Sequence, residues 1–131
     1  MFRVRDLEVV SVVTADLDAA VATFRRNFGL PITRSIESPS TKTKSVFLGI
    51  GAAEIEMATP TEPGSPVASF LAEHGAGLYQ LVIAVDDLEA ARTELADRGI
   101  EVSVKTGADG EPSGYLSPAQ THGVRIALVE R

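Results

Sequence analysis

The chain has 131 residues, 44% hydrophobic and 23% charged, a composition typical of a globular protein long enough to bury a core. Its formal net charge of −6 argues against nucleic acid as a partner, because nucleic-acid binding needs a basic patch. The absence of cysteine excludes disulfides and thiolate chemistry. No apolar stretch approaches the roughly 20 residues of a membrane span, so we expect a cytoplasmic protein without a membrane partner.

The first half of the chain predicts the element order βαβββ. Valine-rich residues 7–13 predict a buried strand, Asp16 can cap the helix that follows, and Gly29 ends that helix. Strands are predicted next at residues 32–37, 43–50 and 54–58. The inward stripe of the helix is predicted to consist of Leu17, Ala20, Val21, Phe24 and Phe28.

The second half predicts the same order after a connecting loop. A short helix over residues 66–74 comes first, with Ser65 as its N-cap and Pro66 at its first position. The remaining predicted elements are a strand at 79–85, a helix at 87–98, a strand at 101–105, a loop at 106–112, and strands at 113–117 and 124–130.

The chain repeats itself at an offset of 71 residues. The segment T-A-D-L-D-A-A at residues 14–20 returns as V-D-D-L-E-A-A at residues 85–91, and the same offset pairs residues 9–13 with residues 80–84. One unit used twice predicts a pseudo-symmetric α+β fold with two mixed four-stranded sheets. A site in such a fold should draw on matching positions in the two halves.

We predict a single domain over residues 1–131. Module one covers about residues 5–59, the inter-module helix about 65–74, and module two about 78–131.

The duplicated βαβββ unit with its D-L-x-A-A helix start resembles the vicinal oxygen chelate superfamily, also called the glyoxalase/bleomycin-resistance fold. Within it, residues 64–71, 77–91 and 115–124 are similar to the methylmalonyl-CoA epimerases. The resemblance implies that two modules pack side by side, that their sheets roll into an open barrel-like cavity, and that a small-molecule ligand lies inside. Members of this fold often form dimers, so we expect a homodimer.

The resemblance also implies four positions for a divalent metal, one on the first and one on the fourth strand of each module. These positions are Val9, Glu56, Gln80 and Ala127. Valine and alanine have no donor atom, and a site of one carboxylate and one amide would bind a divalent ion weakly. We therefore predict no metal ligands and no cofactor.

The resemblance further implies a proton transfer alpha to a thioester, carried out by two carboxylates. One of them corresponds to Ala127 and the other falls near Ser45, and neither residue is an acid. The chain therefore lacks the groups of the family's mechanism at these positions. We predict that it keeps the cavity of an epimerase without the chemistry.

Glu56 is the one candidate catalytic residue. Strand alternation sets it on the face opposite Ile55 and Met57, and in the implied fold this face lines the cavity. Apolar neighbours such as Phe47 would leave the carboxyl group poorly solvated, a setting that suits a general acid or base. Alternatively, Glu56 is a relic that only forms a hydrogen bond with Gln80.

The predicted ligand-binding residues combine an apolar wall with a few polar groups. They are Val9, Ser11, Ser45, Phe47, Glu56, Gln80, Tyr115 and Ala127.

These residues predict a metal-free protein that binds an apolar carbonyl, ketide or acyl-type compound, in sequestration, resistance or biosynthesis. One alternative is a metal-independent isomerase, lyase or cyclase that uses Glu56 as acid or base. Another is a metal-dependent isomerase like the methylmalonyl-CoA epimerases. Replacing Glu56 with glutamine separates the first two functions, because a binder would lose affinity and an enzyme would lose turnover.

Overall fold

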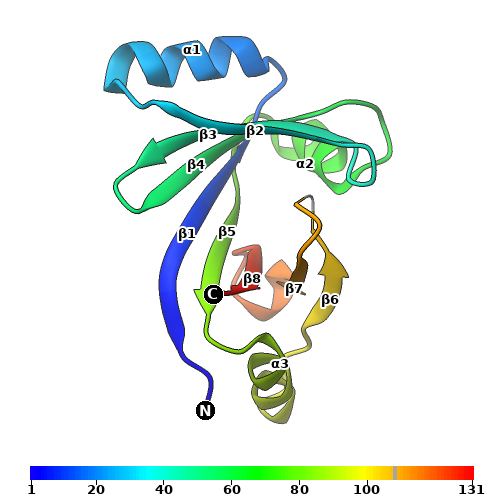
Figure 1. The fold of residues 1–131 in the computed structure, drawn as a ribbon. Helices are drawn as coiled ribbons and strands as arrows, with labels where there is room; N and C mark the ends of the chain where they lie inside the picture. The colour runs from blue at the N-terminus through cyan, green and yellow to red at the C-terminus, as the bar shows by residue number, and fades with distance from the viewer. Residues whose placement is uncertain (108) are drawn as a thin grey trace. The chain divides into compact units, whose positions relative to one another are not determined.

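The computed structural model describes residues 1–107 and 109–131, which divide into two compact units. The first unit comprises residues 10–79, and the second unit comprises residues 80–131 together with residues 1–9. Residue 108, in the predicted loop 106–112, lies outside the described residues. Figure 1 labels the helices and strands.

The first unit contains the predicted βαβββ order followed by a helix. Its elements are β1 (Val4–Val13, of which residues 10–13 belong here), α1 (Leu17–Phe28), β2 (Ile32–Ser38), β3 (Thr43–Ile50), β4 (Ala53–Pro60) and α2 (Pro66–His74). The strands are ordered β2-β3-β4-β1, and the pairs β2/β3 and β3/β4 are antiparallel. All the elements predicted for this part of the chain are confirmed.

The second unit repeats the order. Its elements are β5 (Gly77–Val85), α3 (Leu88–Asp97), β6 (Ser103–Thr106), β7 (Pro112–Leu116), the 3₁₀ helix η1 (Pro118–Gln120) and β8 (Ile126–Glu130). The strands are ordered β5-β8-β7-β6, with β5 parallel to β8 and the other pairs antiparallel, so the sheet is mixed. The α+β class and the duplicated βαβββ module are confirmed. The sequence did not predict η1.

The N-terminal residues belong with the second module, which the repeat did not predict. The backbone N–H of Arg3 donates to the carboxylate of Asp86 at 2.7 Å, and the N–H of Asp86 donates to the carbonyl of Arg3 at 3.0 Å. Strand β1 consequently begins at Val4 rather than at the predicted Leu7. Whether the two units form one domain stays a prediction.

The repeated motif forms a repeated helix cap. The Asp16 side chain accepts a hydrogen bond from the N–H of Ala19 at 3.1 Å, and the Asp87 side chain accepts one from Ala90 at 2.9 Å. These bonds satisfy backbone donors that a helix start leaves without partners. Helix α1 ends at Gly29, whose φ of +65° favours glycine.

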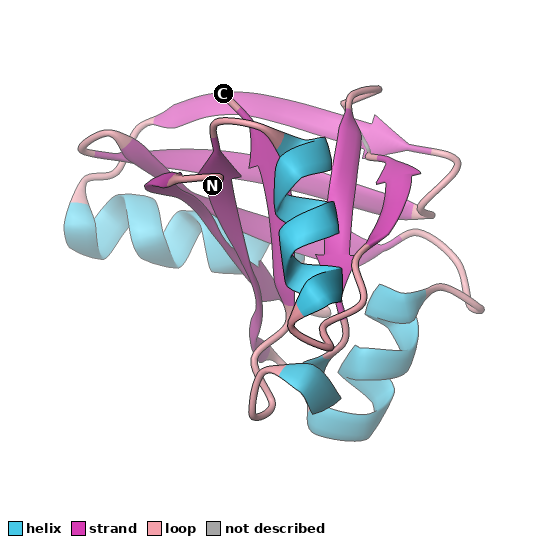
Figure 2. Cartoon of the chain, turned by 90° about the horizontal axis from the view of Figure 1, so that it is seen from below, coloured by secondary structure: helices cyan, strands magenta, loops and turns pink. Residues whose placement is uncertain are grey.

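In each unit a helix packs on one face of the sheet (Figure 2), and in the first unit α2 also contacts β4. In the first unit, α1 packs on β3 and β4 through Leu17, Val21, Leu48 and Met57. In the second unit, α3 packs on β7 and β8 in a cluster made of Val85, Leu88, Ala91, Val102, Leu116 and Leu128. The predicted stripe of α1 is wrong at Phe28, which is 67% exposed because it lies in the last turn.

None of the helices in residues 1–107 and 109–131 combines the length and the apolarity that a membrane crossing requires.

Met57→Ala tests the core of the first unit. Met57 has no exposed surface, so we expect truncation to lower the free energy of unfolding by about 2–5 kcal/mol through lost burial and the cavity left behind. Phe28→Ala is the matched control and should cost less than about 1 kcal/mol, because that ring is largely in solvent. Urea unfolding of both variants measures the difference, and equal losses would contradict this assignment of the core.

Candidate ligand-binding site

The candidate site of the first unit lies on the sheet face that α1 leaves uncovered. Val46, Leu48 and Met57 pack toward α1, and successive side chains of a strand point to opposite faces. Ser45 and Phe47 on β3 and Glu56 on β4 therefore share the other face. The sequence correctly predicted this alternation around Glu56.

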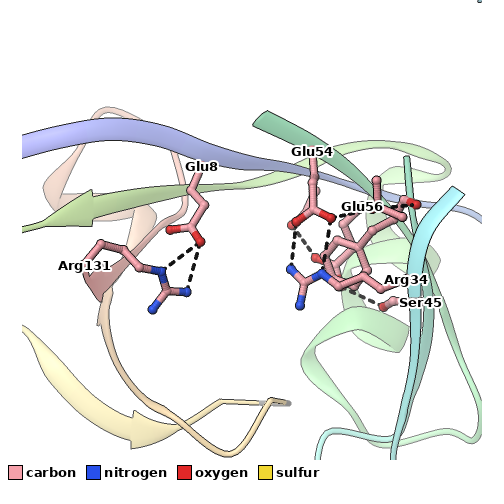
Figure 3. A network of polar contacts seen from close by, with 9 residues as sticks. Glu8, Arg34, Ser45, Glu54, Glu56 and Arg131 are labelled. Atoms are coloured by element: carbon pink, nitrogen blue, oxygen red, sulfur yellow. Dashed lines mark hydrogen bonds and ion pairs between the residues drawn. The ribbon is translucent and has the colours of Figure 1, made fainter. Parts of the chain in front are cut away.

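Two buried serines hold the Glu56 carboxylate. The hydroxyl of Ser11 donates to Oε1 at 2.6 Å, and the hydroxyl of Ser45 donates to Oε2 at 2.7 Å (Figure 3 labels Ser45 and Glu56). The serines are 2% and 4% exposed, whereas Glu56 is half-buried. Hydrogen bonds to a charged acceptor are stronger than neutral ones, so the three side chains fix one another's positions.

An arginine, an aromatic ring and the carboxylate form a row across three strands. Arg34 on β2 is the register partner of Phe47 on β3, and Phe47 is the partner of Glu56 on β4. The guanidinium carbon of Arg34 lies 3.8 Å from the centroid of the Phe47 ring, a cation–π contact. Phe47 is buried, so an apolar ring lies between the charged side chains of Arg34 and Glu56.

Glu54 anchors Arg34 at the end of this row. Arg34 donates to Glu54 through Nη2 at 3.0 Å and Nε at 3.3 Å, and the hydroxyl of Thr33 donates to the same carboxylate at 2.5 Å (Figure 3). Partial burial raises the pKa of Glu54, but the hydrogen bonds from Arg34 and Thr33 and the positive charge of Arg34 together outweigh it. The pKa therefore lies below its ordinary value.

The second unit places its predicted site residues on the corresponding face of its own sheet. Leu128 packs toward α3, so Ala127 points to the opposite face, where Val82 and Tyr115 are its register partners. Ala127 is 3% exposed. Ala127 and Tyr115 thus lie on the sheet face of the second unit that is opposite α3.

The structure brings together three of the predicted residues in direct contact: Ser11, Ser45 and Glu56. Sequence reasoning did not single out Arg34 or Glu54 as site residues. Glu54 and Glu56 are two residues apart on β4, so strand alternation alone puts both side chains on the same face of the sheet. Arg34 offered no such signal, because its position depends on a register shift in β2 between Ile32 and Arg34.

The metal that the superfamily resemblance implies does not fit the residues at its four positions. Val9 and Ala127 are buried and have no donor atoms, and each oxygen of Glu56 accepts a hydrogen bond from a serine. Within residues 1–107 and 109–131, no group of three or more His, Cys, Asp or Glu side chains is arranged to hold a metal ion. A divalent ion prefers several protein ligands, and this donor set does not supply them.

The chain is similar in sequence and in fold to proteins of one superfamily. The model of the Glyoxalase/Bleomycin resistance protein/Dioxygenase superfamily matches residues 10–116. The ethylmalonyl-CoA/methylmalonyl-CoA epimerase of Cereibacter sphaeroides is 31% identical over 127 residues, which cover 93% of this chain and 95% of that protein.

Two epimerases from other organisms extend the likeness. The mitochondrial methylmalonyl-CoA epimerase of Homo sapiens is 30% identical over 126 residues, covering 93% of this chain and 72% of that protein. The crystal structure of methylmalonyl-CoA epimerase from Mycobacterium tuberculosis matches with a TM-score of 0.90 and 27% identity, covering 97% of this chain and 88% of that one.

Ser11→Ala tests how the Glu56 carboxylate is held. We expect a loss of about 1–3 kcal/mol in the free energy of unfolding, because Oε1 of Glu56 would lose its donor while it stays half-buried. Ser69→Ala, at an exposed position of α2, is the matched control and should change stability by less than about 0.5 kcal/mol. In a Glu56→Gln background the cost of Ser11→Ala should shrink, and independent, additive effects would contradict the contact.

Glu54→Gln tests the ion pair with Arg34 through its pH dependence. Because the folded-state pKa of Glu54 is lowered, its contribution to stability is fully present above the ordinary carboxyl pKa and is lost as the pH falls through the lower, folded value. We expect the variant to lose roughly 0.5–1 kcal/mol at neutral pH, since Arg34 is 40% exposed and solvent screens the pair. The difference from wild type should vanish in acid. A gap that stays constant in urea unfolding from neutral to acidic pH would refute this.

Proposed function

The chain belongs to the glyoxalase/bleomycin resistance protein/dioxygenase superfamily, and we propose that it binds a small acyl compound without a divalent metal ion. The relatives named as ethylmalonyl-CoA or methylmalonyl-CoA epimerases support an acyl thioester as the class of ligand. The proposal that no metal is involved rests on the residues at the four positions described above.

The single observation that carries this proposal is the pairing of Glu56 with Ser11 and Ser45. A carboxylate whose two oxygens each accept a serine hydroxyl has its hydrogen-bonding groups arranged before any ligand arrives. Its register partner is Phe47, whose buried ring gives the carboxylate an apolar neighbour. A few fixed polar groups next to an apolar surface are typical of a small-molecule site.

We propose ligand-binding residues in each unit separately. They are Ser11, Ser45, Phe47 and Glu56 of the first unit, and Val9, Gln80, Tyr115 and Ala127 of the second. Val9 and Ala127 contribute apolar surface at positions where the superfamily resemblance expects metal ligands.

A second candidate function is a metal-independent isomerase or cyclase, and the same carboxylate favours it. Glu56 is the acid on this face that forms no ion pair among the described residues, whereas Glu54 is bound to Arg34. A positioned carboxylate beside an apolar surface can remove or return a proton. In this case Glu56 would be catalytic.

We also propose a cytoplasmic homodimer. Exposed apolar side chains at Phe28, Ile32 and Ile50 of the first unit offer surface for a second copy. Light scattering on the purified protein tests the assembly.

Calorimetric titration with propionyl-CoA in the presence of EDTA tests the proposed function, together with elemental analysis of the purified protein. We expect binding that EDTA leaves unchanged and no stoichiometric divalent ion, because the site lacks metal ligands. A stoichiometric ion lost together with binding in EDTA would overturn the proposal.

Glu56→Gln then separates the two candidate functions. Exchange of the thioester's α-proton in D₂O, followed by mass spectrometry, should stay at the uncatalysed rate for both wild type and variant if the protein only binds. Catalysed exchange in the wild type that falls by about 100-fold or more in the variant would instead establish Glu56 as an acid–base catalyst.

A further inference from the structure

We propose that this site selects uncharged acyl groups, favours those with a hydroxyl or other hydrogen-bond donor, and rejects acyl groups that carry a free carboxylate. The inference rests on the proposed function and names the ligand class of the same site. The charges on the sheet face of the first unit opposite α1 carry it.

Three charged side chains lie on this face of β2, β3 and β4: Arg34, Glu54 and Glu56. The other charged residues of β2 and β3, Glu37 and Lys44, are register partners at positions of opposite parity, on the face that α1 covers. One positive and two negative charges leave a net charge of −1. A ligand that approaches Glu56 on this face of the sheet would therefore meet a net negative charge.

Arg34 is already engaged by the protein and offers little to an anionic ligand. Its Nη2 and Nε donate to Glu54, and its guanidinium lies over the Phe47 ring. Moving it onto a ligand carboxylate would break the ion pair and uncover the ring. The positive charge is thus balanced by Glu54 and held in place.

Serine hydroxyls, rather than a cation, hold the Glu56 carboxylate. Within residues 1–107 and 109–131 its hydrogen-bond partners are the hydroxyls of Ser11 and Ser45, and no Lys, Arg or His forms an ion pair with it. Hydroxyl donors stabilise a carboxylate but do not neutralise its charge. Each carboxylate oxygen can accept a further hydrogen bond, so a donor on the ligand is attracted here.

A ligand carboxylate at this place would meet an unscreened charge of the same sign. Like charges a few ångströms apart at a partly buried site weaken binding by about tenfold or more. A divalent ion would cancel this repulsion, but the residues at the metal positions do not fit one. A propionyl group avoids the penalty, and a 3-hydroxybutyryl group adds a donor for Glu56.

The test compares three thioesters that share the same coenzyme A and differ in the acyl group: propionyl-CoA, methylmalonyl-CoA and 3-hydroxybutyryl-CoA. Calorimetric titration of the full chain in EDTA should show methylmalonyl-CoA at least about tenfold weaker than propionyl-CoA, and 3-hydroxybutyryl-CoA at least as tight. Glu56→Gln removes the uncompensated charge, so the gap should close to within about twofold. Glu62→Gln, an exposed charge change in the same unit, should leave the gap unchanged.

A second measurement does not depend on how Glu56→Gln folds. In the wild type, raising NaCl from about 0.05 M to about 0.5 M should narrow the gap between propionyl-CoA and methylmalonyl-CoA, because salt screens partly exposed charges. Equal affinities of the two thioesters for the wild type, or a gap that persists in a folded Glu56→Gln variant, would overturn this inference alone. Failure of all three thioesters to bind the wild type would overturn the proposed function and this inference with it.

Discussion

The hydrogen bonds from Ser11 and Ser45 to Glu56 are the interaction on which this account depends. They place a half-buried acid between strands β1, β3 and β4 and give each of its oxygens a donor. Without them, a carboxylate beside Phe47 would be poorly solvated and without a fixed orientation. With them, the Glu56 carboxylate has a fixed orientation and can accept a hydrogen bond from a ligand. The loss of side-chain entropy then occurs during folding and does not weaken binding.

The row from Arg34 through Phe47 to Glu56 gives the site its chemical character. Glu54 forms an ion pair with Arg34 at one end, the Phe47 ring lies in the middle, and Glu56 lies at the other end. The relatives are named for substrates whose acyl groups carry a carboxylate. We propose, from the charges on this face, that the chain takes an acyl group without a carboxylate, and the buried Val9 and Ala127 have no donor atom for a metal ion that could offset such a charge.

The fold was predictable because its determinants are local. The 71-residue repeat fixed the module, and aspartate caps and strand alternation fixed its elements and the side chains that share a face with Glu56. The position of Arg34 was not predictable, because a register shift in β2 sets it. The hydrogen bond between Arg3 and Asp86 was not predictable either, because it joins residues far apart in the sequence. The helical period of α1 predicted a buried Phe28, but this residue is exposed because it lies in the last turn of the helix. The metal positions came from the family resemblance, and only residue chemistry could show that they no longer match.

A crystal structure of the protein with propionyl-CoA, grown in EDTA, tests the central claim most directly. We expect the acyl group on the sheet face of the first unit opposite α1, within hydrogen-bonding distance of the group formed by Ser11, Ser45 and Glu56. Propionyl-CoA bound away from this face, or a metal ion coordinated by Glu56 in crystals grown with a divalent salt in place of EDTA, would contradict it.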